Sequence, residues 1–138
     1  MNKEFLLVAA PLSVGEGFFR LLAYRQIPFA VLINQREQRE KLRKLGVTHI
    51  VEVDTQDPSG WMPPDFEVGR VLLFEDSLNL TCRYLQMCRQ WTEGPICVIT
   101  GSAKPRALYR GLGASRVVYC PGGDIFSLAV KTYQSISV

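Results

Sequence analysis

Residues 5–15 of this 138-residue chain read FLLVAAPLSVG. The apolar run at residues 5–10 is short and continuous, as in a strand that is buried on both faces of a parallel sheet. Pro11 ends the run, and apolar residues then recur at helical spacing from Val14 to Leu22. A strand, a tight turn and an amphipathic helix in this order predict the first unit of an α/β domain.

The same alternation continues along the chain. We expect further strands at residues 29–33, 49–53, 71–74, 96–100 and 117–120. We expect helices at residues 14–25, 35–45, 78–91, 103–112 and 124–133, with Ser77 and Ser102 as N-caps and Gly46 and Gly113 as stops.

Residues 55–69 contain three prolines and two glycines and predict an irregular crossing of the sheet. Strand–helix units on both sides of such a crossing are typical of a doubly wound fold. The sequence therefore predicts one three-layer, Rossmann-like α/β domain over residues 1–138, with a mainly parallel six-stranded sheet.

Composition narrows the class of protein. Apolar residues make up 47% of the chain and charged residues 21%, which suits a globular domain. The net charge of +3 is mild and does not indicate a nucleic-acid partner. The first apolar run is too short for a membrane span and is read as a buried strand, not a signal peptide.

The four cysteines are predicted to be free thiols in a reducing cytoplasm. They form no C-x-x-C pair, and His49 is the chain's single histidine, so the sequence predicts no metal site. The cysteines are Cys82, Cys88, Cys97 and Cys120.

The first strand-to-helix turn is where a dinucleotide-binding loop would read G-x-G-x-x-G. Here it reads APLSVG at residues 10–15, so Ala10 and Leu12 replace the first two glycines and Gly15 keeps the third. We expect Leu12 to occupy the place of a pyrophosphate and Pro11 to remove a backbone donor, while Ser13 lies in the same turn. The alternative for Gly15 is that it serves packing alone.

Later strand ends offer further candidate contacts. Asn34 stands where an acid would hold a ribose, and Arg36 could meet a phosphate. The alternative is a polar turn that leads into a solvated helix. Asp54, Thr55 and Thr100 close other strands.

Four segments carry a resemblance to a known family. They are LGV at residues 45–47, VEVDT at 51–55, EDSLN at 75–79 and YRGLGASRVV at 109–118. In order and spacing they resemble the N-terminal domain of the regulators of potassium conductance, of the TrkA-N or RCK type. Asp54 and Asn79 match the family's aspartate and asparagine, whereas Val53 replaces a glycine.

The resemblance implies a cytoplasmic domain that binds NAD(H), ATP/ADP or a related nucleotide. It also implies dimers or rings that gate a membrane transport protein. Because the family usually continues into a second ligand-binding domain, we expect a stand-alone domain or a piece of a longer protein. The full set of expected contacts is Ala10, Leu12, Ser13, Gly15, Asn34, Arg36, Asp54, Thr55, Asn79 and Thr100.

Three functions are compatible with these residues. The first is a non-catalytic regulatory domain that senses NAD or an adenine nucleotide and is linked to potassium or other ion transport. The second is a structural or partner-binding domain that has lost nucleotide binding, as the altered loop suggests. The third is an enzyme that uses Glu75, Asp76 or Asp54, but the sequence supplies no complete acid–base or metal set.

Self-association is a separate prediction. The helix at residues 78–91 carries bulky apolar residues away from its main stripe, namely Leu80, Tyr84, Met87 and Trp91. Surplus apolar surface on one helix favours contact with a second copy. We therefore predict a homodimer.

Overall fold

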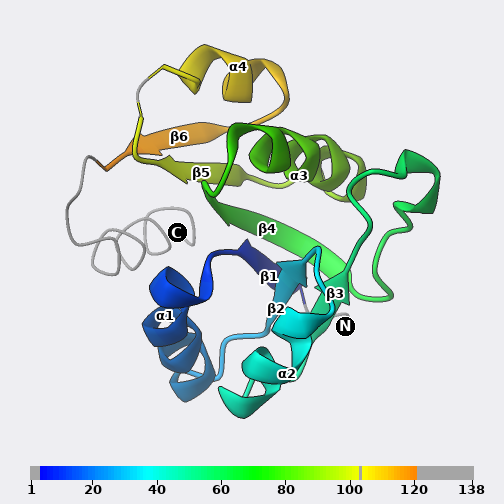
Figure 1. The fold of residues 1–138 in the computed structure, drawn as a ribbon, viewed down its shortest axis with the longest axis vertical. Coiled ribbons are helices and arrows are strands. Elements are labelled where there is room, and N and C mark those ends of the chain that lie inside the picture. Colours follow the sequence, from blue (N-terminus) through cyan, green and yellow to red (C-terminus); the bar gives the residue numbers. More distant parts are fainter. Residues whose placement is uncertain (1–3, 103, 121–138) are drawn as a thin grey trace.

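A computed structural model describes residues 4–102 and 104–120 and shows a three-layer α/β domain (Figure 1). Within these residues one six-stranded sheet has the order β3-β2-β1-β4-β5-β6, and every neighbouring pair is parallel. The predicted Rossmann-like architecture is confirmed. Its strands are β1 Glu4–Ala9, β2 Phe29–Ile33, β3 Ile50–Glu52, β4 Glu67–Phe74, β5 Ile96–Thr100 and β6 Arg116–Tyr119.

Helices of the described residues cover both faces of the sheet (Figure 1). On one face lie α1 Leu12–Tyr24 and α2 Glu37–Lys44, whose Phe18 and Leu42 are buried in one core cluster. On the other lie α3 Leu78–Trp91 and α4 Arg106–Gly111, whose Leu85 and Tyr109 are buried in a second cluster. No helix within the described ranges has the length and apolar character needed to cross a membrane.

Several element boundaries differ from the prediction. β4 begins at Glu67, so it includes residues assigned to the irregular crossing. The Ser77 cap is confirmed, since its side chain accepts a hydrogen bond from Leu80 N at 3.1 Å. The Ser102 cap is wrong: α4 begins at Arg106 after Pro105, and Ser102 Oγ accepts from Lys104 N in a preceding turn. The helix expected at residues 124–133 lies outside the described residues.

A single tryptophan anchors the irregular crossing between β3 and β4. Between β3 and β4 the chain forms one short 3₁₀ helix, η1 Pro58–Gly60. Trp61 is buried against the sheet in the same core cluster as Leu32, and its indole Nε1 donates a hydrogen bond to Asp54 O at 3.0 Å. The ring therefore covers apolar sheet surface that would otherwise face water.

The surface behind the dimer prediction is not present on α3. Tyr84 and Met87 are buried, and Leu80 and Trp91 pack against the same core cluster. The helix uses these residues within the chain because the irregular crossing and β4 pack beside it. The residue-based argument for self-association is therefore wrong, although Leu78 remains 47% exposed.

Burial of the cysteines matches the sequence prediction at three positions and differs at Cys82. All four are free, and Cys88, Cys97 and Cys120 are buried while Cys82 is partly exposed. Among the described residues no group of three His, Cys, Asp or Glu side chains could hold a metal ion.

Candidate functional site

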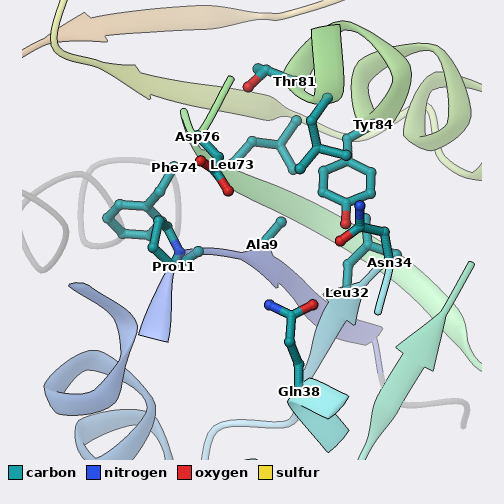
Figure 2. Close-up of a pocket in the computed structure, with 12 residues that line it drawn as sticks. Ala9, Pro11, Leu32, Asn34, Gln38, Leu73, Phe74, Asp76, Thr81 and Tyr84 are labelled. Carbon is teal, nitrogen blue, oxygen red and sulfur yellow. The ribbon is translucent and has the colours of Figure 1, made fainter. Parts of the chain in front are cut away.

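A narrow crevice lies at the carboxyl ends of β1, β2 and β4 (Figure 2). This is the topological switch point, because the chain winds outward in opposite directions from β1 and β4. The crevice has room for about 30 Å³, which suits a water or two rather than a nucleotide. Its walls are formed by Ala9, Ala10, Pro11, Leu32, Asn34, Gln38, Leu73, Phe74, Asp76, Leu80, Thr81 and Tyr84.

Gln38 brings an unsatisfied polar atom to this crevice. Its Oε1 is buried and has no hydrogen-bond partner among the residues that the structure describes. Figure 2 shows the carboxamide extending from α2 toward the turn after β1. Leaving such a group unpaired costs about 1–3 kcal/mol, so a bound donor would be stabilised here.

Asn34 and Tyr84 point toward each other across the crevice (Figure 2). Asn34 follows β2 directly, whereas Tyr84 comes from the buried face of α3. Burial is the main cause that raises the pKa of Tyr84 well above 10, with smaller contributions from Cys88 and Asp76. The tyrosine therefore stays protonated and can donate to a ligand.

The N-terminus of α1 also opens at this edge of the sheet. Pro11 is its N-cap residue, no side chain caps the helix, and its first turn holds no acid. By contrast, Ser77 caps α3. Uncapped N–H groups at a helix N-terminus favour an anion, although Pro11 itself supplies no donor.

The predicted loop contacts separate in the structure. Ala10 lines the crevice, but Leu12 does not: its side chain packs against the core cluster on the α1 face of the sheet. Ser13 is exposed on α1. A Cβ at Gly15 would lie 2.7 Å from Phe19 Cζ, so this glycine allows α1 to pack closely. The expected obstruction by Leu12 is therefore absent from the crevice walls.

Thr55 and Asn79 lie in a second hollow beside the crevice. This hollow is open to solvent, has a volume of about 920 Å³ and shares Leu80 with the crevice. Arg83 also lines this hollow, and its Nη1 donates to Thr55 O at 3.1 Å. Asp54 lines neither space, because its carboxylate accepts from Gln56 N at 3.0 Å and shapes the turn after β3.

Thr100 belongs to a different cluster. Its Oγ1 donates a hydrogen bond to Glu75 Oε1 at 2.7 Å, and the Tyr109 hydroxyl donates to Glu75 Oε2. Burial, followed by the hydrogen bond with Glu75, raises the pKa of Tyr109 above its ordinary 10.0. Both oxygens of Glu75 thus already accept hydrogen bonds within the protein, which fits a structural role for this carboxylate.

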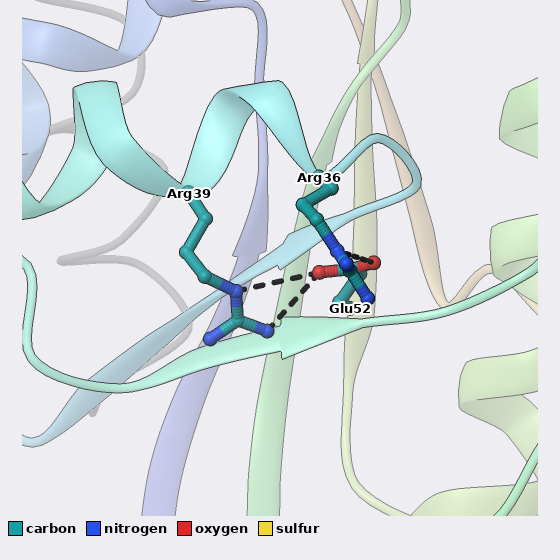
Figure 3. Close-up of polar contacts among 3 residues, drawn as sticks. All are labelled: Arg36, Arg39 and Glu52. Carbon is teal, nitrogen blue, oxygen red and sulfur yellow. Dashed lines mark hydrogen bonds and ion pairs between the residues drawn. The ribbon is translucent and has the colours of Figure 1, made fainter.

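Arg36 and Arg39 flank Glu52 near the end of β2 (Figure 3). Arg39 donates to Glu52 Oε1 through Nε at 3.3 Å and Nη2 at 3.2 Å. Arg36 Nε lies 3.9 Å from Glu52 Oε2, and the Arg36 side chain is 86% exposed. These three residues form the charged cluster.

Sequence reasoning missed most of the crevice. It singled out Ala10 and Asn34 as site residues, but not Gln38, Thr81 or Tyr84. One signal was available for Gln38. It lies one helical turn before the buried Leu42, so both face the same side of α2.

Comparisons with solved structures find the same fold. The NAD(P)-binding domain of an exopolyphosphatase-related protein from Archaeoglobus fulgidus has a TM-score of 0.71 at 22% identity, covering 96% of each chain. The TrkA-N domain of the inner membrane protein ybaL from Escherichia coli has a TM-score of 0.67 at 18% identity, covering 99% of this chain and 98% of that one.

A third similar structure is the GsuK channel bound to NAD, with a TM-score of 0.67 at 17% identity. The match covers 85% of this chain but only 21% of the channel chain. No family model matches the sequence, and neither does any of the curated proteins compared with it. These likenesses show that the chain has a Rossmann-like fold similar to that of the GsuK and TrkA-N domains.

Proposed function

We propose that this chain is a non-catalytic regulatory domain that senses NAD or an adenine nucleotide at the crevice. One observation carries the proposal: Gln38 Oε1 is buried, has no hydrogen-bond partner within residues 4–102 and 104–120, and faces a crevice at the switch point of a doubly wound sheet. Ligands of such sheets bind outside the carboxyl ends of the strands, where the winding reverses. A ligand amino or hydroxyl group would supply the missing donor.

The similar structures support this proposal. One GsuK structure is described as bound to NAD and another as bound to ADP. The domain matches 21% of the GsuK channel chain. We therefore propose that it acts beside a potassium channel or other membrane transport protein. We propose that the domain works in the cytoplasm as a homodimer, a state suggested by the family resemblance and not by α3.

Binding would require the crevice to widen. At about 30 Å³ it is smaller than the pockets that hold small ligands, which are roughly 300–1,000 Å³. Asn34 and Gln38 border solvent, and the larger hollow beyond Leu80 adjoins the crevice. Movement of the Leu80 side chain on α3, which borders both, would join the two spaces.

Thermal shift and calorimetric titration with NAD, NADH, ATP, ADP and AMP test the proposal. A ligand at a hundred times its Kd should stabilise the fold by about 2.7 kcal/mol. Gln38→Ala should lower the affinity for that ligand. It should leave the stability of the free protein unchanged or higher, because an unsatisfied acceptor is removed. Gln90→Ala, at an exposed glutamine on α3, is the matched control.

A structural or partner-binding domain without nucleotide binding is the second candidate. The small crevice and the proline in the first turn favour it. Failure of all five nucleotides to shift the melting temperature would support this candidate against the first. Light scattering after size-exclusion chromatography tests the homodimer, and a monomer at micromolar concentration would contradict it.

A further inference from the structure

A hollow at the edge of the sheet lies apart from the crevice. It is formed by α4 and by β6, the last strand in the order of the sheet (Figure 1). Its volume of about 400 Å³ is within the range of pockets that hold small ligands. We propose that this hollow binds a small molecule that carries two or more neighbouring phosphate groups. The inference does not depend on the proposed function, since the hollow and the crevice share no lining residue.

Three arginines line the hollow, and none of the other described residues that line it carries a charge. Arg106 and Arg110 come from α4, and Arg116 is the first residue of β6. The fold brings these cations to one place, because α4 lies beside β6 (Figure 1). Glu75 contacts the lining residue Thr100 but does not itself line the hollow. The hollow therefore favours anions.

Arg106 and Arg110 stand one turn apart on α4, so their side chains lie on the same face of the helix. Both residues are exposed, and neither side chain forms a hydrogen bond or an ion pair with another residue within 4–102 and 104–120. Like charges at this spacing destabilise a helix. An anion held between the two guanidinium groups would remove this repulsion and accept hydrogen bonds from both.

Hydroxyl groups add further donors to the hollow. Ser102 Oγ accepts a hydrogen bond from Lys104 N, which leaves the hydroxyl proton available to a ligand. Tyr119 also lines the hollow and is 52% exposed. A single carboxylate would balance only one of the three cations, whereas neighbouring phosphates supply enough charge and enough oxygens to engage all of them. This set of donors therefore favours a chain of phosphates.

The basic helix α2 provides a comparison within the same chain. It carries Arg43 and Lys44, which are exposed, but Glu37 and Glu40 lie on the same helix. Charges of opposite sign along one helix are typical of a solvated surface. An anion that is attracted to positive charge in general would bind α2 as well as the hollow. Substitution on α2 therefore separates a specific site from general attraction.

Calorimetric titration of the intact chain with inorganic phosphate, pyrophosphate and tripolyphosphate tests the inference. From phosphate to pyrophosphate to tripolyphosphate, we expect the affinity to rise roughly tenfold or more at each step, as for one further hydrogen bond between charged groups. The affinity should fall at high salt, because the arginines are exposed. These ligands carry neither a base nor a ribose, so they do not make the contacts proposed for a nucleotide in the crevice.

Substitutions assign the binding to the hollow. Arg106→Gln and Arg110→Gln should each weaken tripolyphosphate binding roughly tenfold or more. Neither should lower the melting temperature, since each removes a pair of like charges from α4. Arg43→Gln makes the same charge change at an exposed arginine of α2 and should leave the affinity unchanged. Gln38→Ala, in the crevice, should also leave it unchanged.

The possible failures are distinguishable. Absence of binding by both pyrophosphate and tripolyphosphate overturns this inference while the proposed function stands. If Arg43→Gln weakens tripolyphosphate binding as much as Arg106→Gln does, the anion follows positive charge in general and the hollow is not its site. A loss caused by Gln38→Ala would place the anion in the crevice and overturn the inference as well. Absence of binding by every nucleotide overturns the proposed function alone.

Discussion

The Tyr109 hydroxyl donates a hydrogen bond to Glu75 Oε2 and so ties α4 to the carboxyl end of β4. Thr100, the last residue of β5, donates from its Oγ1 to the other carboxylate oxygen, Glu75 Oε1, at 2.7 Å. Tyr109 is fully buried, whereas Glu75 is partly buried. This pair fixes the position of β4 at the strand edge where the crevice opens.

Tyr109→Phe should therefore destabilise the protein. The ring would still fill its buried place, but Glu75 would lose a donor that is worth about 1.5–3 kcal/mol to a charged acceptor. Urea unfolding followed by circular dichroism measures the loss. Tyr119→Phe, at a residue that is 52% exposed, should change stability by less than about 0.5 kcal/mol. Equal stability of the two variants would contradict a role for the Tyr109–Glu75 bond.

Stability should fall as pH rises above about 9. Burial raises the pKa of Cys88 from 9.0 to about 12, although the charge of Arg89 opposes this shift. Burial likewise raises the pKa of Cys97 to about 11. Below pH 9 both states keep these protons, but above it only the unfolded chain releases them, so unfolding becomes easier.

The free energy of unfolding should fall by up to about 1.4 kcal/mol per pH unit for each such thiol. Urea unfolding between pH 8 and pH 10 measures the decline, to which Tyr84 and Tyr109 add near pH 10 because burial raises their pKa above the ordinary 10.0. Cys88→Ala should make the decline shallower, even if that variant is less stable at every pH. If the slope were unchanged, the Cys88 thiol would not be the source of the decline, and the prediction would be contradicted.

Gly15→Ala should also destabilise the fold, despite the better helix propensity of alanine. The new Cβ would lie 2.7 Å from Phe19 Cζ and 3.2 Å from Ala10 Cβ, so α1 would have to shift. Overpacking of this kind costs about 1–3 kcal/mol. Gly111→Ala is the comparison, since a Cβ there meets nothing within 4 Å, and it should be neutral or slightly stabilising. Thermal unfolding of both variants checks the sign.

Trp61→Ala should cost about 3–5 kcal/mol, because it leaves apolar sheet surface uncovered. Trp61→Phe should cost less, since the phenyl ring still covers part of that surface and mainly the hydrogen bond to Asp54 O is lost. Chemical denaturation followed by circular dichroism gives both values. The neighbouring Met62 is 73% exposed, and Met62→Ala should lie within about 0.5 kcal/mol of the parent protein. If Trp61→Ala were equally mild, Trp61 would not anchor the crossing.

The charged segment around Arg36 shows how far the sequence reached into the site. It located Asn34 and Arg36 at the end of a strand, because strand ends follow from apolar runs. It did not find Arg39 paired with Glu52, since the two lie on different elements that only the folded chain brings together. The same holds for Gln38 and Tyr84, which reach the crevice from α2 and α3.

The sequence by itself determined the order of strands and helices, the irregular crossing and the parallel sheet, because apolar periodicity and turn residues act locally. Tertiary structure alone decided that Leu12 packs against the core while Gln38 faces the crevice. It also decided that the bulky residues of α3 are buried within the chain. The direction of a side chain depends on which elements pack against its own, and that packing joins residues far apart in the chain.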